Sequence, residues 1–440
     1  MKSFYLYLCA IFAALGGLLS GYDMGGISGA ILYIEKSFNM TSELTGILVS
    51  SASLGAVIGA ILNGLIIDKI GRKNTLILTS LIFITGSIFC FFSRNIYELI
   101  LSRTFLGCAV GIVSFACPLY LSEISEKSKR GRIVSIYQLA VTFGILFSYL
   151  INYAFSLNPL NWRLMLSFGV IPALVMFFGI IFQKDTPRWY ILKGKTDEAK
   201  SALEKFDNKV DVEAEIESIK STISNSEEKL KFSKKLIMPF VIGMGMMFIQ
   251  ITTGINAIIY YAPIIFKQIG FNSNQDVLCI TILIGIINFL MTFVAIALVD
   301  KIGRKPLLYT GLIGMLISSI FIGISFIICA PIIKLLAIIA TATYIISFSM
   351  SLGPVALLLI SEVFPLQYRG SAMSVAIVAN FTFNFLTTAL FPIALKHIGG
   401  FYTFLIFSAL CFGSIIFIKF VVPETKGKSL EEIEKSWEKV

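Results

Sequence analysis

Long apolar segments recur along the chain, and short polar turns separate most of them. A transmembrane helix needs about 20 consecutive, predominantly apolar residues. Twelve segments reach this length, which predicts an all-α integral membrane protein with twelve transmembrane helices. The segments are residues 5–33, 44–67, 74–93, 97–121, 132–154, 164–183, 237–267, 276–299, 307–328, 331–360, 371–395 and 400–422.

One long polar stretch interrupts this pattern after the sixth segment. Within it, KTDEAKSALEKF and VEAEIESIK carry mixed charges at helical spacing, which predicts short amphipathic helices on the cytoplasmic surface. The expected fold is therefore two pseudo-symmetric six-helix bundles joined by a short cytoplasmic helical linker. The predicted divisions are the N-terminal bundle 1–184, the linker 185–235, the C-terminal bundle 236–422 and a cytoplasmic tail 423–440.

Composition agrees with a membrane protein, because 56% of the 440 residues are hydrophobic, only 14% are charged and the mean hydropathy is +0.86. The net charge of +10 could suggest a nucleic-acid partner, but Lys and Arg gather in short loops on one side of the predicted spans. By the positive-inside rule these loops are cytoplasmic, which places both termini in the cytoplasm. The short loops are typical of bacteria. We therefore expect a monomer in the lipid bilayer of the cytoplasmic (inner) membrane, with no nucleic-acid partner.

The chain shows no sign of a disulfide framework or a metal centre. Six of the seven cysteines fall within the predicted spans and Cys329 lies in the short turn between two of them. None forms a CxxC motif or a metal-like spacing with the single histidine, His397. Nothing in the polar stretch 185–235 resembles a nucleophile with its base or a phosphate-binding loop. We therefore expect no metal, no cofactor and no enzyme activity.

One carboxylate lies well inside the first span. Asp23 stands in the glycine-rich sequence GGLLSGYDMGGISGA, and a charged group at the bilayer centre costs about 2.5–3.5 kcal/mol on insertion scales. Arg103 of the fourth span is its expected partner, and alternation between paired and separated states would make Asp23 a proton carrier. Two other interpretations stay open: Asp23 is solvated near the interface, or the two residues form a static ion pair that only fixes packing.

The two halves of the chain share a repeated cytoplasmic loop. The hexamer DKIGRK begins at Asp68 and again at Asp300, 232 residues later, and in each half an acid precedes an arginine by seven residues. Charged residues at helix ends can form salt bridges that hold a gate shut, whereas topogenic charge alone does not explain the acids. The predicted gating residues on this face are Asp68, Arg72, Glu123, Arg130, Asp300, Arg304, Glu362 and Arg369.

The seventh span contains a polar island within the sequence FIQITTGINAIIYYAP, residues 248–263. Its polar members are Gln250, Thr252, Thr253 and Asn256. Hydrocarbon does not tolerate such groups without partners, and Gly254 allows the backbone to bend so that the amides face a cavity. The island predicts a site for a neutral ligand that is rich in hydroxyl groups. Tyr260 and Tyr261 follow it, and they are expected either to close an outer gate or to form an aromatic belt.

These features together resemble the sugar porter family of the major facilitator superfamily. The similarity covers nearly the whole chain in the family's order: GYDMGGISG, the two DKIGRK loops, PLYLSEISEKSKRG, TPRW, QITTGIN with YY, GPVALLLISEVFPLQYRG and PETKGKSLEEIE. The resemblance implies a twelve-helix transporter whose halves rock about a central sugar site. A monosaccharide and a proton are then its expected ligands.

The resemblance also implies roles for individual residues. Amides suit sugar binding because each offers a donor and an acceptor without a charge to desolvate. The implied sugar contacts are Gln138, Gln250, Asn256, Asn288 and Asn380, with Phe248 and Phe348 lining the pocket. Asp23 and Arg103 match the acid and arginine of the proton-coupled members. Ile251, Leu357 and Phe381 depart from the usual glutamine and two tryptophans, so the sugar preference does not carry over.

The resulting interpretation is a secondary active transporter that imports a monosaccharide by alternating access with proton symport. The alternatives are a facilitated-diffusion uniporter, in which Asp23 is structural, and a membrane sugar sensor that does not transport. A sensor usually carries a long signalling tail, and only about 18 residues follow Val422. A membrane enzyme is disfavoured because the buried acid faces an arginine rather than a second carboxylate or metal ligands. Hexose, pentose and polyol stay open as substrates.

Overall fold

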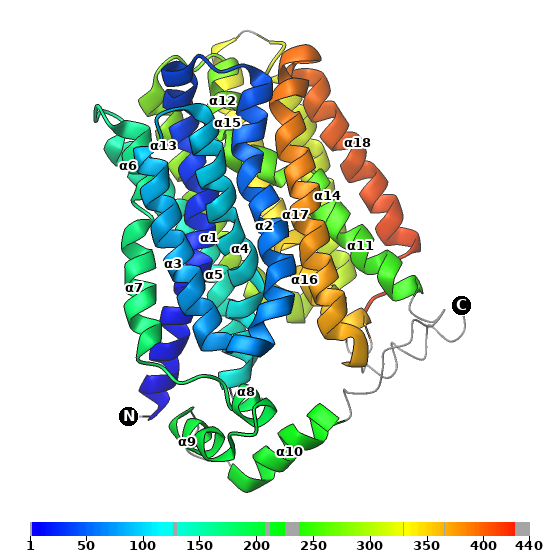
Figure 1. Ribbon diagram of the computed structural model, residues 1–440. Coiled ribbons are helices and arrows are strands. Elements are labelled where there is room, and N and C mark those ends of the chain that lie inside the picture. Colours follow the sequence, from blue (N-terminus) through cyan, green and yellow to red (C-terminus); the bar gives the residue numbers. More distant parts are fainter. Residues whose placement is uncertain are drawn as a thin grey trace.

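The computed structural model describes residues 2–125, 130–206, 212–224, 237–328, 330–364 and 366–426. These residues form helices and connecting turns, without a strand (Figure 1). Twelve of the helical segments are long and apolar enough to cross a membrane, so the predicted all-α membrane architecture is confirmed. The predicted division of the chain into domains stays a prediction.

The first half contains six spans, of which the sixth is divided into two helices. The break lies at Phe168 and Gly169, between α6 and α7. The elements of this half are α1 (Lys2–Phe38), α2 (Ser42–Ile70), α3 (Arg72–Phe92), α4 (Ile96–Ile124), α5 (Arg130–Phe155), α6 (Asn161–Ser167) and α7 (Val170–Ile181).

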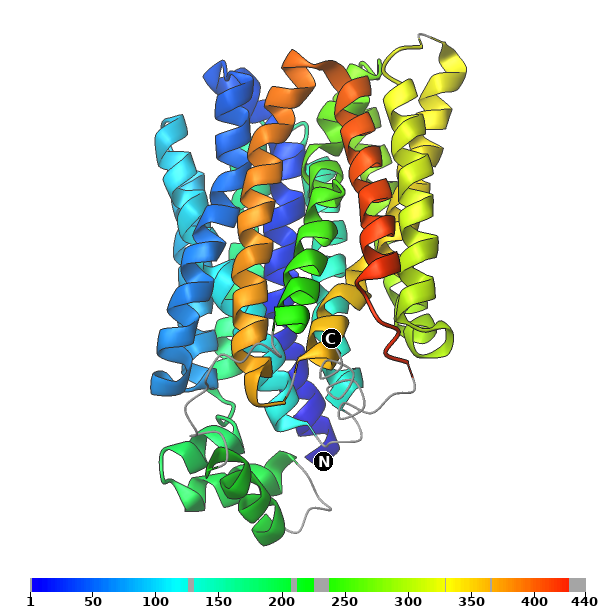
Figure 2. The same cartoon turned by 90° about the vertical axis from the view of Figure 1, so that its right-hand side faces the viewer.

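Three short helices follow the first half, and they lie outside one end of the helix bundle, here called the linker end (Figures 1 and 2). They are α8 (Pro187–Leu192), α9 (Thr196–Phe206) and α10 (Val212–Ser224). The amphipathic α9 buries its apolar face against the start of α1, where the rings of Phe206 and Tyr5 lie 5.7 Å apart. These helices match the amphipathic pattern expected of the linker.

The second half also contains six spans, and its first and fourth spans are broken. The elements are α11 (Ile237–Thr252), α12 (Ile255–Gln268), α13 (Asn274–Ile302), α14 (Arg304–Ile324), α15 (Pro331–Met350), α16 (Leu352–Val363), α17 (Leu366–His397) and α18 (Gly399–Phe420). The seventh and tenth spans of the chain thus become α11 with α12, and α15 with α16.

The break in the seventh span depends on a glycine, as the polar island indicates. Gly254 separates α11 from α12 with φ +106°, a conformation that a side chain would strain. A methyl group there would also lie 2.8 Å from the Phe407 ring. The tenth span breaks at Ser351, three residues before Pro354, and a proline is tolerated in the first turn of the following helix.

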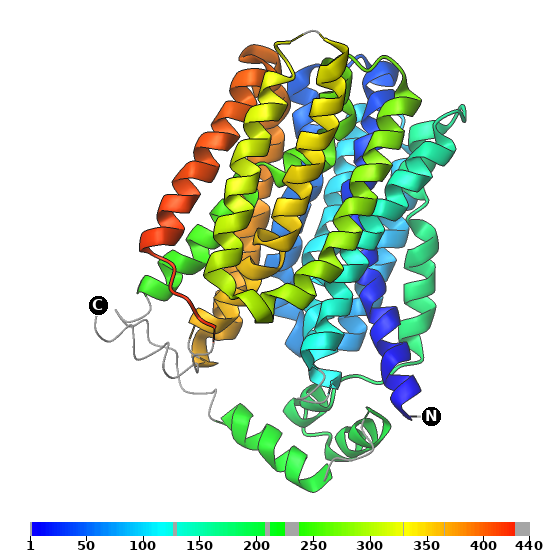
Figure 3. The same cartoon turned by 180° about the vertical axis from the view of Figure 1, so that it is seen from behind.

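The two halves meet closely at the end opposite the linker. Gly46 of α2 lets α17 approach so closely that an added methyl group would lie 2.3 Å from the Ala389 carbonyl. Nearby, Tyr149 of α5 donates a hydrogen bond to the Ile259 carbonyl of α12 at 2.9 Å. Toward the linker end, the ribbons of the two halves diverge (Figure 3). Among the described residues, the polar contacts between halves lie from mid-membrane to the opposite end.

Candidate functional site

The first group of predicted site residues surrounds Gln250 in the second half. The Gln250 amide donates to the Leu352 carbonyl at 3.2 Å and accepts from Asn380 of α17 at 2.8 Å. The Leu352 carbonyl lies in the first turn of α16, directly after the break in the tenth span. Phe348 lies one turn before the break, and its ring would be 3.5 Å from a methyl group at Gly353. The two helix breaks therefore bring Gln250, Asn380 and Phe348 together.

A second group joins the two halves. Asn256 of α12 donates to the Asn384 side chain of α17 at 2.9 Å. Asn384 in turn donates to Ser53 of α2 at 3.0 Å and to the Tyr260 hydroxyl at 3.5 Å. Asn384 and Ser53 were not among the predicted site residues. The four-residue spacing of Asn380 and Asn384 on one helix face is the signal that points to Asn384.

The remaining amides lie where α5 and α13 cross. Asn288 of α13 accepts from Ser349 of α15 at 2.7 Å, and Thr292, one turn further, contacts Thr142 of α5 at 3.4 Å. Gln138 lies one turn before Thr142 and is half-buried. The role of Gln138 in sugar binding stays a prediction.

The predicted aromatic residue Phe248 lies apart from these amide pairs. Its side chain is 42% exposed and packs edge-to-face against Phe383, with the ring centres 5.3 Å apart. Ile251, in place of the usual glutamine, is buried in the apolar core, whereas Leu357 is 38% exposed. The role of Phe248 in a binding pocket stays a prediction.

Asp23 and Arg103 form a buried ion pair inside the first half. Two guanidinium nitrogens of Arg103 contact the two carboxylate oxygens of Asp23 at 3.2 and 3.4 Å. The third, Nε, donates to the Leu48 carbonyl of α2 at 3.3 Å. The Arg103 side chain is fully buried and that of Asp23 is 9% exposed. Bidentate pairing offsets part of the cost of burying the two charges.

Tyr260 and Tyr261, the predicted outer gate, are both buried. The Tyr261 hydroxyl donates to the Thr388 carbonyl of α17 at 2.8 Å. The Tyr260 hydroxyl accepts from Asn384 at 3.5 Å, so this tyrosine joins the second group of amide contacts. A gating role for the two tyrosines stays a prediction.

At the linker end of the first half, Arg72 contacts two acids. It lies 2.8 Å from Asp68 and 3.0 Å from Glu123 of α4, and the Thr186 hydroxyl donates to Glu123 at 2.6 Å. The Asp185 carboxylate caps α3 by accepting from the backbone of Arg72 and Lys73 at 3.1 and 3.2 Å. Burial raises the pKa of Asp185 to about 6, although these backbone hydrogen bonds act in the opposite direction.

The second half repeats this arrangement at its own linker end. Arg304 contacts Glu362 of α16 at 2.7 Å, and the Thr425 hydroxyl donates to Glu362 at 2.6 Å. The Glu424 carboxylate caps α14 through the backbone of Arg304 and Lys305 at 3.1 and 2.9 Å. Burial raises the pKa of Glu424, but several backbone hydrogen bonds outweigh it and hold that pKa below its ordinary value.

The repeated loops thus supply the arginine, and α4 and α16 supply the acid. Four residues of this arrangement were not among the predicted gating residues: Asp185, Thr186, Glu424 and Thr425. The signal was present, because Asp185 and Glu424 are separated by the same 239 residues as Glu123 and Glu362. The side chains of three predicted gating residues lie outside the described part of the chain: Arg130, Asp300 and Arg369.

The single histidine lies at the opposite end, where it contacts the other half. His397 of α17 lies 3.7 Å from Glu43 of α2, and both side chains are well exposed. Within the described residues, no group of three or more His, Cys, Asp or Glu side chains could hold a metal ion.

Comparison with known proteins relates this arrangement to transporters. Residues 9–437 match the family described as Sugar (and other) transporter. The chain is 40% identical to a D-xylose transporter of Levilactobacillus brevis, over 96% of this chain and 94% of that protein. It is 36% identical to the galactose-proton symporter of Escherichia coli (strain K12), over 99% and 95% of the two chains. The partially occluded inward open structure of the xylose transporter XylE from E. coli superposes with a TM-score of 0.87 at 30% identity, covering 97% of this chain and 100% of that one.

Proposed function

The chain belongs to the sugar transporter family, and we propose that it imports a monosaccharide together with a proton by alternating access. Membership in this family makes the chain a transporter rather than an enzyme. One observation carries the proposal: neutral amide pairs line the second half, while a buried carboxylate with an arginine partner lies in the first. The amides would bind the sugar, and the carboxylate would carry the proton.

The amide pairs have the chemistry that sugar hydroxyls require. Gln250 with Asn380, and Asn256 with Asn384, hydrogen-bond to one another and leave no buried charge at the site. A bound sugar can exchange these contacts for hydroxyl contacts at little cost, because each amide is both donor and acceptor. Relatives named for xylose and for galactose support a monosaccharide as the substrate.

Asp23 has the surroundings that a proton carrier needs. Protonation would neutralise its carboxylate and weaken its attraction to Arg103, whereas deprotonation would restore the pair. The galactose-proton symporter among the relatives supports this coupling. Protonated Asp23 would favour loading of the sugar from outside, and release of the sugar and the proton inside would reset the carrier.

The arrangement of contacts supports an inward-facing state. Polar contacts between the halves of the described chain lie from mid-membrane to the end opposite the linker, and the structural relative is an inward-open form. Lys and Arg concentrate in the loops at the linker end, which we assign to the cytoplasm. The protein would then work as a monomer in the cytoplasmic membrane, with both termini inside.

Uptake of radiolabelled sugars into proteoliposomes tests the proposal. The panel contains D-xylose, D-galactose, D-glucose and myo-inositol, each measured under an inward proton gradient with and without a protonophore. We expect one monosaccharide to accumulate above equilibrium and the protonophore to abolish that accumulation. If the sugar instead only equilibrates across the membrane, and the protonophore does not change its uptake, the protein is a uniporter. A static Asp23–Arg103 pair would favour that function.

A further inference from the structure

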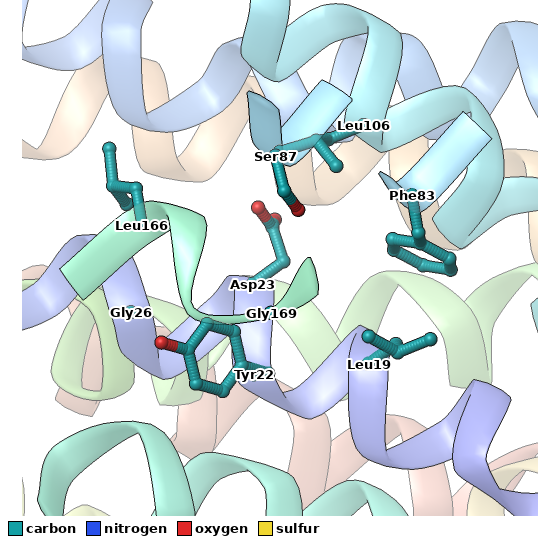
Figure 4. A pocket seen from close by; sticks show the side chains of 9 residues that line it. All are labelled: Leu19, Tyr22, Asp23, Gly26, Phe83, Ser87, Leu106, Leu166 and Gly169. Carbon is teal, nitrogen blue, oxygen red and sulfur yellow. The ribbon is translucent and has the colours of Figure 1, made fainter. Parts of the chain in front are cut away.

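A small pocket lies beside Asp23 within the first half (Figure 4). Its volume is about 10 Å³, which is room for about one water molecule. Its walls come from α1, α3, α4 and the break between α6 and α7. They consist of Leu19, Tyr22, Asp23, Gly26, Phe83, Ser87, Leu106, Leu166 and Gly169. Arg103 is not among them, so Asp23 borders the pocket on a side that its ion pair with Arg103 does not occupy.

Besides Asp23 and Tyr22, Ser87 supplies a polar group to this mostly apolar wall. Its side chain is only 3% exposed, and within the described residues its hydroxyl has no protein hydrogen-bond partner. Figure 4 shows Ser87 and Asp23 pointing toward one another. Buried hydroxyl groups are almost always satisfied by protein or by ordered water. The pocket thus offers a water molecule the minimum of two polar partners.

The break in the sixth span closes the pocket. A methyl group at Gly169 would lie 3.2 Å from the Tyr22 ring and 3.6 Å from the Ser87 hydroxyl. Tyr22 holds this region through its hydroxyl, which donates to the Met165 carbonyl at 2.6 Å. The glycine at this position therefore lets the backbone between α6 and α7 approach both side chains and form one wall of the pocket.

We propose that the pocket holds one water molecule that Ser87 positions against the Asp23 carboxylate. This inference rests on the proposed proton coupling. When Arg103 separates from Asp23, the water remains as a hydrogen-bond partner. Protonation transfers a proton from a protonated water to a carboxylate oxygen, so that one O–H bond breaks in the donor, one forms on Asp23 and neutral water is left. Deprotonation is the reverse step, and Ser87 serves both because its hydroxyl can donate or accept.

The test measures the protonation of Asp23 directly, without a sugar. Infrared difference spectroscopy of the purified protein in liposomes, titrated with pH, records the carbonyl stretch of protonated carboxylic acids. The band that Asp23→Asn removes belongs to Asp23. In Ser87→Ala the ionised carboxylate loses its positioned partner, so the midpoint of this band should move to higher pH by about one unit, the size expected for one hydrogen bond to a charged group.

A second variant fills the pocket without touching Ser87. In Gly26→Ala the added methyl group would lie 3.7 Å from its nearest neighbour, the Met165 carbonyl, which is an ordinary contact. It would take the space of the water and move the midpoint in the same direction. Ser80→Ala is the matched control, because Ser80 is also buried on α3 but donates to its own helix at the Ile77 carbonyl. Its midpoint should equal that of the wild type.

The outcomes separate this inference from the proposed function. A midpoint that stays within about 0.2 pH units of the wild type in both pocket variants overturns the water site and leaves proton coupling intact. If no band titrates in the wild type that Asp23→Asn removes, Asp23 does not exchange protons, and both proposals fail. A shift in both pocket variants but not in Ser80→Ala supports the site.

Discussion

Arg103 connects Asp23 of α1 to the backbone of α2, because its Nε donates to the Leu48 carbonyl at 3.3 Å while its other nitrogens contact the carboxylate. Five residues later, Ser53 on the same helix accepts from Asn384 of the second half. The ion pair and a contact between the halves therefore act on one helix. Release of Arg103 would change the support of α2 and, through it, the contact between the halves.

Loss of the Ser53 hydroxyl should destabilise the state in which the two halves are closed at the end opposite the linker. One buried hydrogen bond is worth about 1 kcal/mol, which is roughly a fivefold change in the ratio of two states. Electron–electron distance measurements between spin labels at Asn39 and Asn272, exposed at that end in different halves, should show about five times more of the long-distance population in Ser53→Ala. Ser50→Ala is the control, since Ser50 bonds to its own helix. Identical distributions in the two variants would contradict this role.

Removal of the Gln250 amide should weaken sugar binding strongly without lowering the amount of the protein in the membrane. Gln250→Ala deletes a ligand contact and leaves the Asn380 amide without its partner at 2.8 Å, so affinity should fall at least tenfold. Equilibrium binding of the transported sugar measures this. Thr252→Ala is a matched control, because the Thr252 hydroxyl bonds to the Phe248 carbonyl of its own helix. Unchanged affinity in Gln250→Ala would rule out the proposed site.

The two linker-end ion pairs should differ in their contribution to stability. The side chains of Arg72 and Glu123 are 5% and 6% exposed, whereas those of Arg304 and Glu362 are 11% and 18% exposed. Breaking a buried pair costs about 3–5 kcal/mol, and a more solvated pair costs less. Glu123→Gln should therefore lower the melting temperature in detergent more than Glu362→Gln. The reverse order would show that burial does not set their strength.

The stability of the protein should depend on pH through Asp185. An unfolded aspartate titrates near pH 3.9, whereas the folded pKa is about 6, so between these values the native state holds a proton that the unfolded state has lost. The free energy of unfolding, relative to Asp185→Asn, should therefore decrease by about 2 kcal/mol as the pH rises from about 4 to 6. Thermal denaturation of both proteins across this range measures it. Parallel pH profiles would exclude the effect.

The sequence was sufficient to predict the fold because membrane insertion requires long apolar segments, and such segments can be recognised directly in the amino-acid sequence. The pairing of Asp23 with Arg103 was also predictable, because an unpaired charge inside the membrane is costly and these two residues carry opposite charges. The bend at Gly254 was also predictable, because the glycine stands inside a polar island.

Partner choice within the site was less predictable. In the sequence an arginine follows Glu123 by seven residues. In the structure, however, Glu123 forms its salt bridge with Arg72, because the folded chain brings α3 beside α4. Ser53 could not be recognised for a similar reason, since serines often bond to their own helix and only the approach of α17 makes this one a contact between halves. Ile251 shows why a family pattern does not fix the sugar: here an apolar side chain occupies a buried position.

Uphill sugar accumulation by Asp23→Asn in vesicles with an imposed inward proton gradient tests the central claim most directly. Asparagine preserves the shape of the side chain but cannot exchange a proton, so the variant should equilibrate the transported sugar without concentrating it, while the wild type accumulates it. Accumulation that persists in Asp23→Asn and still collapses with a protonophore would show that the proton is carried elsewhere.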